Sequence, residues 1–123
     1  MFSFLGMFGR SQEMQRFDRA LRAAGLHPLL APDAVKLTAL KLIKETGREP
    51  DSDAAAAELL SYCVLGADGF AETNDLSVIE GVEARLEAAL EAGDSLDARL
   101  VLLALHAGVI QPSVVEQFGL EAA

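Results

Sequence analysis

The sequence predicts an all-α fold, a single-domain bundle of about six short helices around a buried central helix at about residues 95–107. Apolar residues recur at helical spacing, and no stretch alternates apolar and polar residues for long enough to indicate a strand. The run DSLDARLVLLALHAG, residues 94–108, would carry apolar side chains all round a helix. Such a helix must be covered on several sides, so we expect it at the centre of the fold.

Two helices are predicted in the N-terminal part of the chain. The first covers about residues 12–24, between Ser11, which suits an N-cap, and Gly25, which suits a helix end. The second covers about residues 33–46, because Pro32 suits the start of a helix, where its missing N–H costs nothing. A connector that contains two prolines separates these helices.

The middle of the chain predicts one apolar and one amphipathic helix. The first of these, about residues 52–65, is rich in alanine and leaves little polar surface, so we expect it to contact the central helix. Gly66 ends it, and a loop follows over residues 66–74. The next helix covers about residues 75–92. Its Gly81 costs about 1 kcal/mol relative to Ala, which indicates close packing of the helix backbone.

The C-terminal part predicts the central helix and one short helix. Asp94 or Ser95 caps the central helix after a connection of only two residues, so this helix and the preceding one should be antiparallel neighbours. Pro112 begins the last helix, which continues to about Phe118.

The net charge of −9 is unevenly distributed. Residues 1–48 carry eight basic and four acidic side chains, whereas the rest of the chain carries two basic and fifteen acidic ones. An excess of acid argues against nucleic-acid binding, which depends on neutralising phosphates. The asymmetry indicates that the two halves attract each other, within one chain or between two, or that one half contacts a charged partner.

Residues 1–10, MFSFLGMFGR, are predicted to form an apolar N-terminal arm that precedes a single helical domain at 11–123. No basic stretch precedes the apolar part, so we expect no signal peptide, and the arm is far shorter than the roughly 20 residues that span a bilayer. We expect the arm to pack on its own domain or on a neighbouring subunit. Disorder and shallow membrane insertion, aided by Arg10, Arg16 and Arg19, are the alternatives. Its candidate contact residues are Phe2, Phe4, Leu5 and Phe8.

The sequence contains none of the common phosphate, dinucleotide, zinc or hydrolase motifs. His106 falls in the last turn of the predicted central helix, where the helix dipole accounts for it, and His27 lies in a connector. Cys63, the only cysteine, falls in an apolar helix, where we expect inert packing and no disulfide within the chain. No catalytic or cofactor-binding residue is therefore predicted, and we expect a protein that is not an enzyme.

Four glutamates lie along one side of the predicted helix at 75–92, and they form a candidate interaction face. Like charges at this spacing repel one another, and Arg85 is not placed to pair with any of them along the helix. Three interpretations stay open: a solvated face, a face docked on basic residues, and a contribution to a metal site. The four residues are Glu80, Glu83, Glu87 and Glu91.

The segment ADGFAETND, residues 67–75, resembles the Ala-Asp-Gly turn of tellurite-resistance-type (TerB-like) helical domains, in which an acid follows six residues after the Gly. The resemblance implies an all-α fold with Asp68, Glu72 and Asp75 as metal-facing acids, and Asp75 stands where the family has Glu. The alternative is an ordinary turn in which Asp75, Asn74 or Thr73 caps the following helix.

The sequence therefore predicts a non-catalytic cytoplasmic helical module that acts by protein interaction or self-association, with the same chain, as a homodimer, or another protein as its partner. One alternative is a divalent-metal-binding stress-response domain that uses the acidic segment 68–75, with the metal ion as its only cofactor. The other is a peripheral membrane protein that attaches through residues 2–8.

Overall fold

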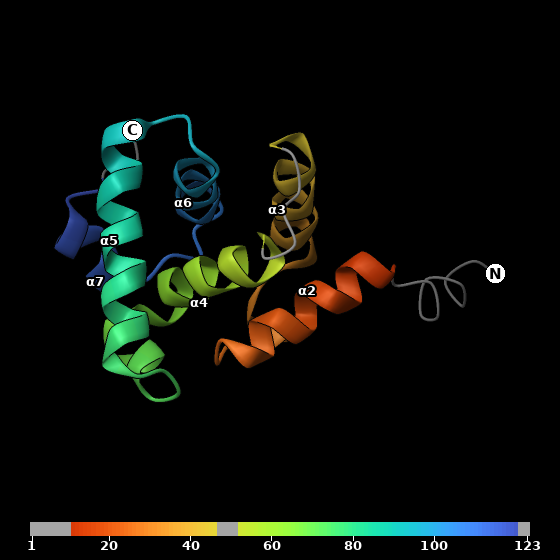
Figure 1. Ribbon diagram of the computed structural model, residues 1–123, viewed down its shortest axis with the longest axis horizontal. Helices are drawn as coiled ribbons and strands as arrows, with labels where there is room; N and C mark the ends of the chain where they lie inside the picture. The colour runs from red at the N-terminus through yellow and green to blue at the C-terminus, as the bar shows by residue number, and fades with distance from the viewer. Residues whose placement is uncertain (1–10, 47–51, 121–123) are drawn as a thin grey trace.

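The computed structural model describes residues 11–46 and 52–120, and all regular structure in these ranges is helical (Figure 1). This confirms the predicted all-α fold. The arm at residues 1–10 lies outside the described ranges. The elements are α2 (Gln12–Ala23), the 3-10 helix η1 (Pro28–Leu30), α3 (Asp33–Glu45), α4 (Ser52–Ala71), α5 (Leu76–Ala92), α6 (Leu96–His106) and α7 (Pro112–Phe118).

Three of the described α-helices begin at side-chain caps. The Ser11 hydroxyl accepts a hydrogen bond from the Met14 N–H at 3.0 Å, and the Ser95 hydroxyl accepts one from the Ala98 N–H at 3.1 Å. Asp75 caps α5 in the same way. Each cap satisfies a backbone donor that the helix itself leaves unpaired, which is why the predicted starts of these helices agree closely with the structure.

α4 is the central helix of the fold, and the prediction that residues 95–107 take this place is wrong. α4 lies between α5 on one side and α2 and α3 on the other (Figure 1), and it also packs against α6 and α7. α6 packs on α3, α4 and α5 and leaves Leu102 46% exposed. The small side chains of Ala56 and Ala57 are fully buried and let neighbouring helices approach α4 closely, whereas Leu102 of α6 extends beyond the surface that the neighbours of α6 cover.

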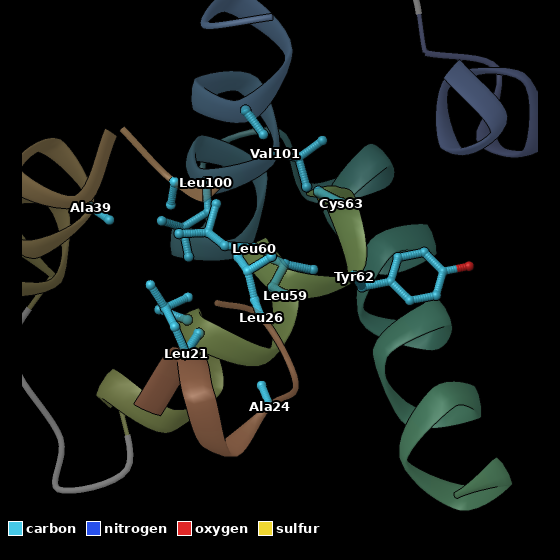
Figure 2. Close-up of a cluster of buried hydrophobic side chains, with 14 of the residues drawn as sticks. Leu21, Ala24, Leu26, Ala39, Leu59, Leu60, Tyr62, Cys63, Leu100 and Val101 are labelled. Atoms are coloured by element: carbon cyan, nitrogen blue, oxygen red, sulfur yellow. The ribbon is translucent and has the colours of Figure 1, made fainter. Parts of the chain in front are cut away.

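One hydrophobic core joins α4 to the other helices. Leu59 and Leu60 of α4 lie among Leu21, Leu26 and Leu100 (Figure 2), and all five side chains are at most 1% exposed. Fully burying a leucine side chain contributes about 1.5–3 kcal/mol, so this cluster is a main source of stability. Of the described helices, α4 alone is long and apolar enough to span a membrane. Its packing inside the bundle accounts for that apolar character.

α4 is interrupted at Gly66, and the loop predicted over residues 66–74 is largely wrong. Gly66 has φ 80° and ψ 171°, and the chain resumes a helix that continues to Ala71. The break leaves the Cys63 carbonyl without its helical partner, and the Gln111 N–H donates to it at 2.8 Å. α7 therefore begins against the break in α4. The sequence correctly placed an interruption at Gly66. The helix resumes after it because a helical turn there buries the Phe70 side chain in the core.

A buried lysine ties α2, η1 and α3 together. The Lys36 side chain is buried, and its ammonium donates to Asp18 Oδ1 at 3.0 Å and to the Pro28 carbonyl at 3.1 Å. Asp33, one turn earlier on α3, lies 3.4 Å from the same nitrogen. A charge removed from water is tolerated only when it is paired and hydrogen-bonded. This network satisfies the ammonium and holds the N-terminal elements in register.

Ion pairs also join the other helices. Arg85 of α5 forms two hydrogen bonds with the Asp97 carboxylate of α6, at 2.8 and 3.0 Å, and donates to the Ala55 carbonyl of α4 at 3.0 Å. Lys44 pairs with Glu13 at 2.9 Å, so part of the basic excess of the N-terminal half is neutralised within that half.

We predict that Gly66→Ala lowers the free energy of unfolding by about 1–3 kcal/mol, because this combination of φ and ψ is accessible almost only to glycine. A Cβ at Gly66 would also lie 3.1 Å from the Ser113 hydroxyl. Gly81→Ala is the matched control. A Cβ there meets nothing within 4 Å, contrary to the close packing predicted at Gly81, so this substitution should stabilise α5 by up to about 1 kcal/mol. Denaturant unfolding measures both, and equal effects would contradict the role given to Gly66.

We also predict that Asp18→Ala costs about 2–3 kcal/mol of unfolding free energy, because it leaves a buried ammonium with too few partners. Lys36→Met should cost less, since it removes the charge together with its need for partners. The comparison uses urea unfolding of the two single variants and the double variant. If the unpaired Lys36 ammonium is what destabilises Asp18→Ala, adding Lys36→Met should restore part of the stability. A double variant that is less stable than Asp18→Ala alone would contradict this explanation.

Candidate functional site

An apolar groove lies at the surface between the C-terminal end of α5, the outer side of α6 and the residues that follow α7. Its volume is about 250 Å³. Leu90, from α5, is 50% exposed, and Leu102, from α6, is 46% exposed. The groove is lined by Ala89, Leu90, Gly93, Ala98, Val101, Leu102, Leu105, Gly119 and Leu120. No side chain in this lining carries a polar group, so the surface of the groove is mainly apolar.

Two glycine turns shape this groove. Gly93, at φ 74°, ends α5 and leads directly into the cap of α6, which sets these helices side by side. Gly119, at φ 64°, ends α7, and the Leu120 N–H then donates to the Val115 carbonyl at 2.9 Å. This turn directs the Leu120 side chain into the core, where it is only 8% exposed. The groove was not predicted from the sequence. The feature that could have indicated it is the run of leucines in α6, which places apolar side chains on the outer side of that helix as well as on its buried side.

The three acids implied by the TerB-like resemblance are not gathered into a metal site. Asp68 and Glu72 are exposed, and Asp75 caps α5, as the alternative interpretation of this segment predicted. The Ser77 hydroxyl and the Val78 N–H donate to the Asp75 carboxylate and lower its pKa. Among the described residues, no group of three or more His, Cys, Asp and Glu side chains has an arrangement that could hold a metal ion.

A polar hollow of about 390 Å³ lies beside the break in α4. Asp68 lies at its edge together with Gln111, Ser113 and Gln117, which come from the start and body of α7. Gln117 is engaged elsewhere, because its amide donates to Glu83 at 3.2 Å. The hollow therefore brings Asp68 close to amides and a hydroxyl rather than to other acids.

The glutamate face of α5 is split by the structure. Glu83 turns inward and accepts a hydrogen bond from the Tyr62 hydroxyl at 2.6 Å. Glu80, Glu87 and Glu91 are exposed, and no hydrogen bond or ion pair joins them to another described residue. Some of the basic side chains that could have docked on this face form ion pairs with other acids. Lys44, for example, pairs with Glu13. Glu80, Glu87 and Glu91 are thus free to meet a partner or solvent.

Tyr62 and Cys63 are held as structural groups. The Tyr62 ring packs edge-on against Phe70 and Phe118, at centroid distances of 5.5 and 6.4 Å. Burial and the hydrogen bond to Glu83 raise the pKa of the Tyr62 hydroxyl. Burial raises the pKa of the Cys63 thiol to about 12, far from the range in which a thiolate forms at neutral pH.

The two histidines stand apart from these groups. His27 accepts a hydrogen bond from the Leu29 N–H at 3.1 Å and caps η1, and His106 lies exposed in the last turn of α6. Neither histidine is hydrogen-bonded to Cys63 or to a carboxylate in the described part of the chain. Both positions agree with the structural roles that the sequence indicates for them.

Comparison with family models finds no match for this sequence, and comparisons with curated proteins and with solved structures find no significant similarity. They neither support nor contradict the resemblance of residues 67–75 to TerB-like domains, which stays a prediction. Function must therefore be argued from the groove, the charges and the chemistry of the described residues.

We predict that Cys63 in the folded protein does not react with a disulfide reagent at pH 8, and that one thiol per chain reacts after unfolding in guanidinium chloride. The raised pKa also implies a pH dependence. The unfolded chain loses the thiol proton near pH 8.5 while the folded chain keeps it, so the free energy of unfolding should fall as pH rises from about 8.5 towards 12. Cys63→Ala should show a smaller fall. Rapid labelling of the native protein would contradict the buried position.

Proposed function

We propose that this protein is a non-catalytic helical module that acts by binding protein, that the groove of α5 and α6 is its contact surface, and that the first partner is a second copy of the same chain. The single observation that carries the proposal is the apolar groove with Leu90 and Leu102 half exposed on it. An exposed apolar hollow is costly in water, and such surfaces in soluble proteins commonly mark sites of interaction.

The surroundings of the groove favour protein as the partner. Glu91 and Asp94 are exposed and directly follow the groove residues Leu90 and Gly93 in the chain, so acidic groups lie close in sequence to an apolar surface, a combination that protein interfaces also show. Burying the remaining surface of each leucine contributes roughly 1 kcal/mol, which supports reversible association. The acids on this side of the molecule would repel both nucleic acid and anionic lipid.

The same chemistry supports a reducing compartment, and we propose the cytoplasm. The only cysteine is buried as a free thiol. Disulfides form in oxidising compartments, and a chain with a single cysteine cannot form one internally. Metal binding by the acidic segment is not favoured by any observation on the described residues, and so it is not proposed as the function.

We predict that Leu102→Glu weakens self-association about 30-fold or more, because it removes about 1 kcal/mol of apolar burial and also places a carboxylate without a partner in an apolar contact, so that the two effects together reach at least about 2 kcal/mol. Leu37→Glu is the matched control, since Leu37 is 57% exposed on α3 and outside the groove. Sedimentation velocity over a wide range of protein concentration measures both. A wild-type chain that stays monomeric throughout, or two variants that weaken association equally, would contradict the proposal.

A further inference from the structure

We infer that the occupant of the groove is the apolar arm, residues 1–10, of a second copy of the chain, and that two copies exchange their arms. The inference rests on the proposed function and names the segment that the groove would bind.

The chemistry of the arm matches that of the groove. The arm, MFSFLGMFGR, contains no acidic residue, and Arg10 is its only basic one. An apolar protein cavity of about 150 Å³ accepts a benzene ring, so a groove of about 250 Å³ accepts one phenylalanine ring with space for part of a neighbouring side chain. Phe2, Phe4 and Phe8 give the arm three rings of this size.

Charge at the rim favours the same segment. Glu87, Glu91 and Asp94 are exposed on or just after the last turns of α5, and the described residues provide no partner for any of them. Arg10 follows the aromatic part of the arm directly and would meet these acids once the phenylalanines are seated. An arm with an acidic residue would be repelled here, whereas a basic one gains a favourable contact at the edge of an apolar site.

The position of α2 favours the groove of another copy over that of the same chain. α2 begins at the far end of the molecule from α5 and α7 (Figure 1), and near this start Glu13 pairs with Lys44 of α3 and Arg16 with Asp53 of α4. Phe8 precedes Ser11 by three residues and Phe4 by seven, so even fully extended they reach only about 10 and 24 Å from it. A second copy removes this limit, because its groove can approach the arm.

Exchange of two arms closes the assembly. If each arm enters the groove of the other copy, the two contacts are identical and related by a two-fold axis, which gives a dimer and not an open chain. Each arm loses conformational freedom when it binds, and the two contacts made together offset this cost better than one contact alone.

The test is complementation between two full-length variants. Leu102→Glu alters the groove and leaves the arm intact, whereas the double variant Phe4→Asp/Phe8→Asp alters the arm and leaves the groove intact. Each variant alone should associate about 30-fold or more weakly than wild type. An equimolar mixture should form a dimer of mass two chains that is tighter than that of either variant alone and weaker than that of wild type, because one intact arm meets one intact groove and the second contact is lost. Leu90→Glu provides a second groove variant, and circular dichroism checks that every chain is folded.

The other outcomes separate this inference from the proposed function. If the arm variant associates as wild type does while Leu102→Glu does not, the arm inference is overturned and self-association through the groove stands. If both variants are monomeric and their mixture stays monomeric, the arm and the groove do not meet between copies, and exchange is overturned. A monomeric wild-type chain that binds anionic vesicles only with an intact arm would overturn both proposals and favour membrane attachment.

Discussion

Burial of α4 is the constraint on which the positions of the other helices depend. Its apolar side chains face neighbours in several directions, so α2 and α3 cover one side while α5, α6 and α7 cover others. α4 packs against all of these helices with a break in its own axis. The break at Gly66 turns its last residues and leaves the Cys63 carbonyl for Gln111, which anchors α7. Packing and backbone geometry thus act together at one residue.

Polar contacts complete this arrangement at specific points and do not drive it. Lys36 joins α2, η1 and α3, and Arg85 joins α4, α5 and α6. Both side chains lose part or all of their hydration in the fold, so each needs several acceptors, and those acceptors come from different helices. Such groups select one packing of the bundle over others because a shifted helix would leave a charge without partners. The Tyr62–Glu83 hydrogen bond plays the same role between α4 and α5.

The groove shows how a surface site arises from unequal covering. α6 is apolar on nearly every side, but its neighbours cover only part of it, and Leu102 and Leu105 remain at the open side. Glu91 and Asp94, which follow Leu90 in the chain, are exposed.

The helical class, the helix starts at Ser11, Asp75 and Ser95 and the inert character of Cys63 could be predicted from the sequence, because capping and periodicity act between residues close in the chain. Packing between distant helices places α4 at the centre instead of α6, returns the chain to helix after Gly66, and brings Glu83 to the Tyr62 hydroxyl. These outcomes depend on which surfaces distant helices cover. Apolar composition shows that a helix needs covering, but only the packed arrangement shows which of its sides stays open.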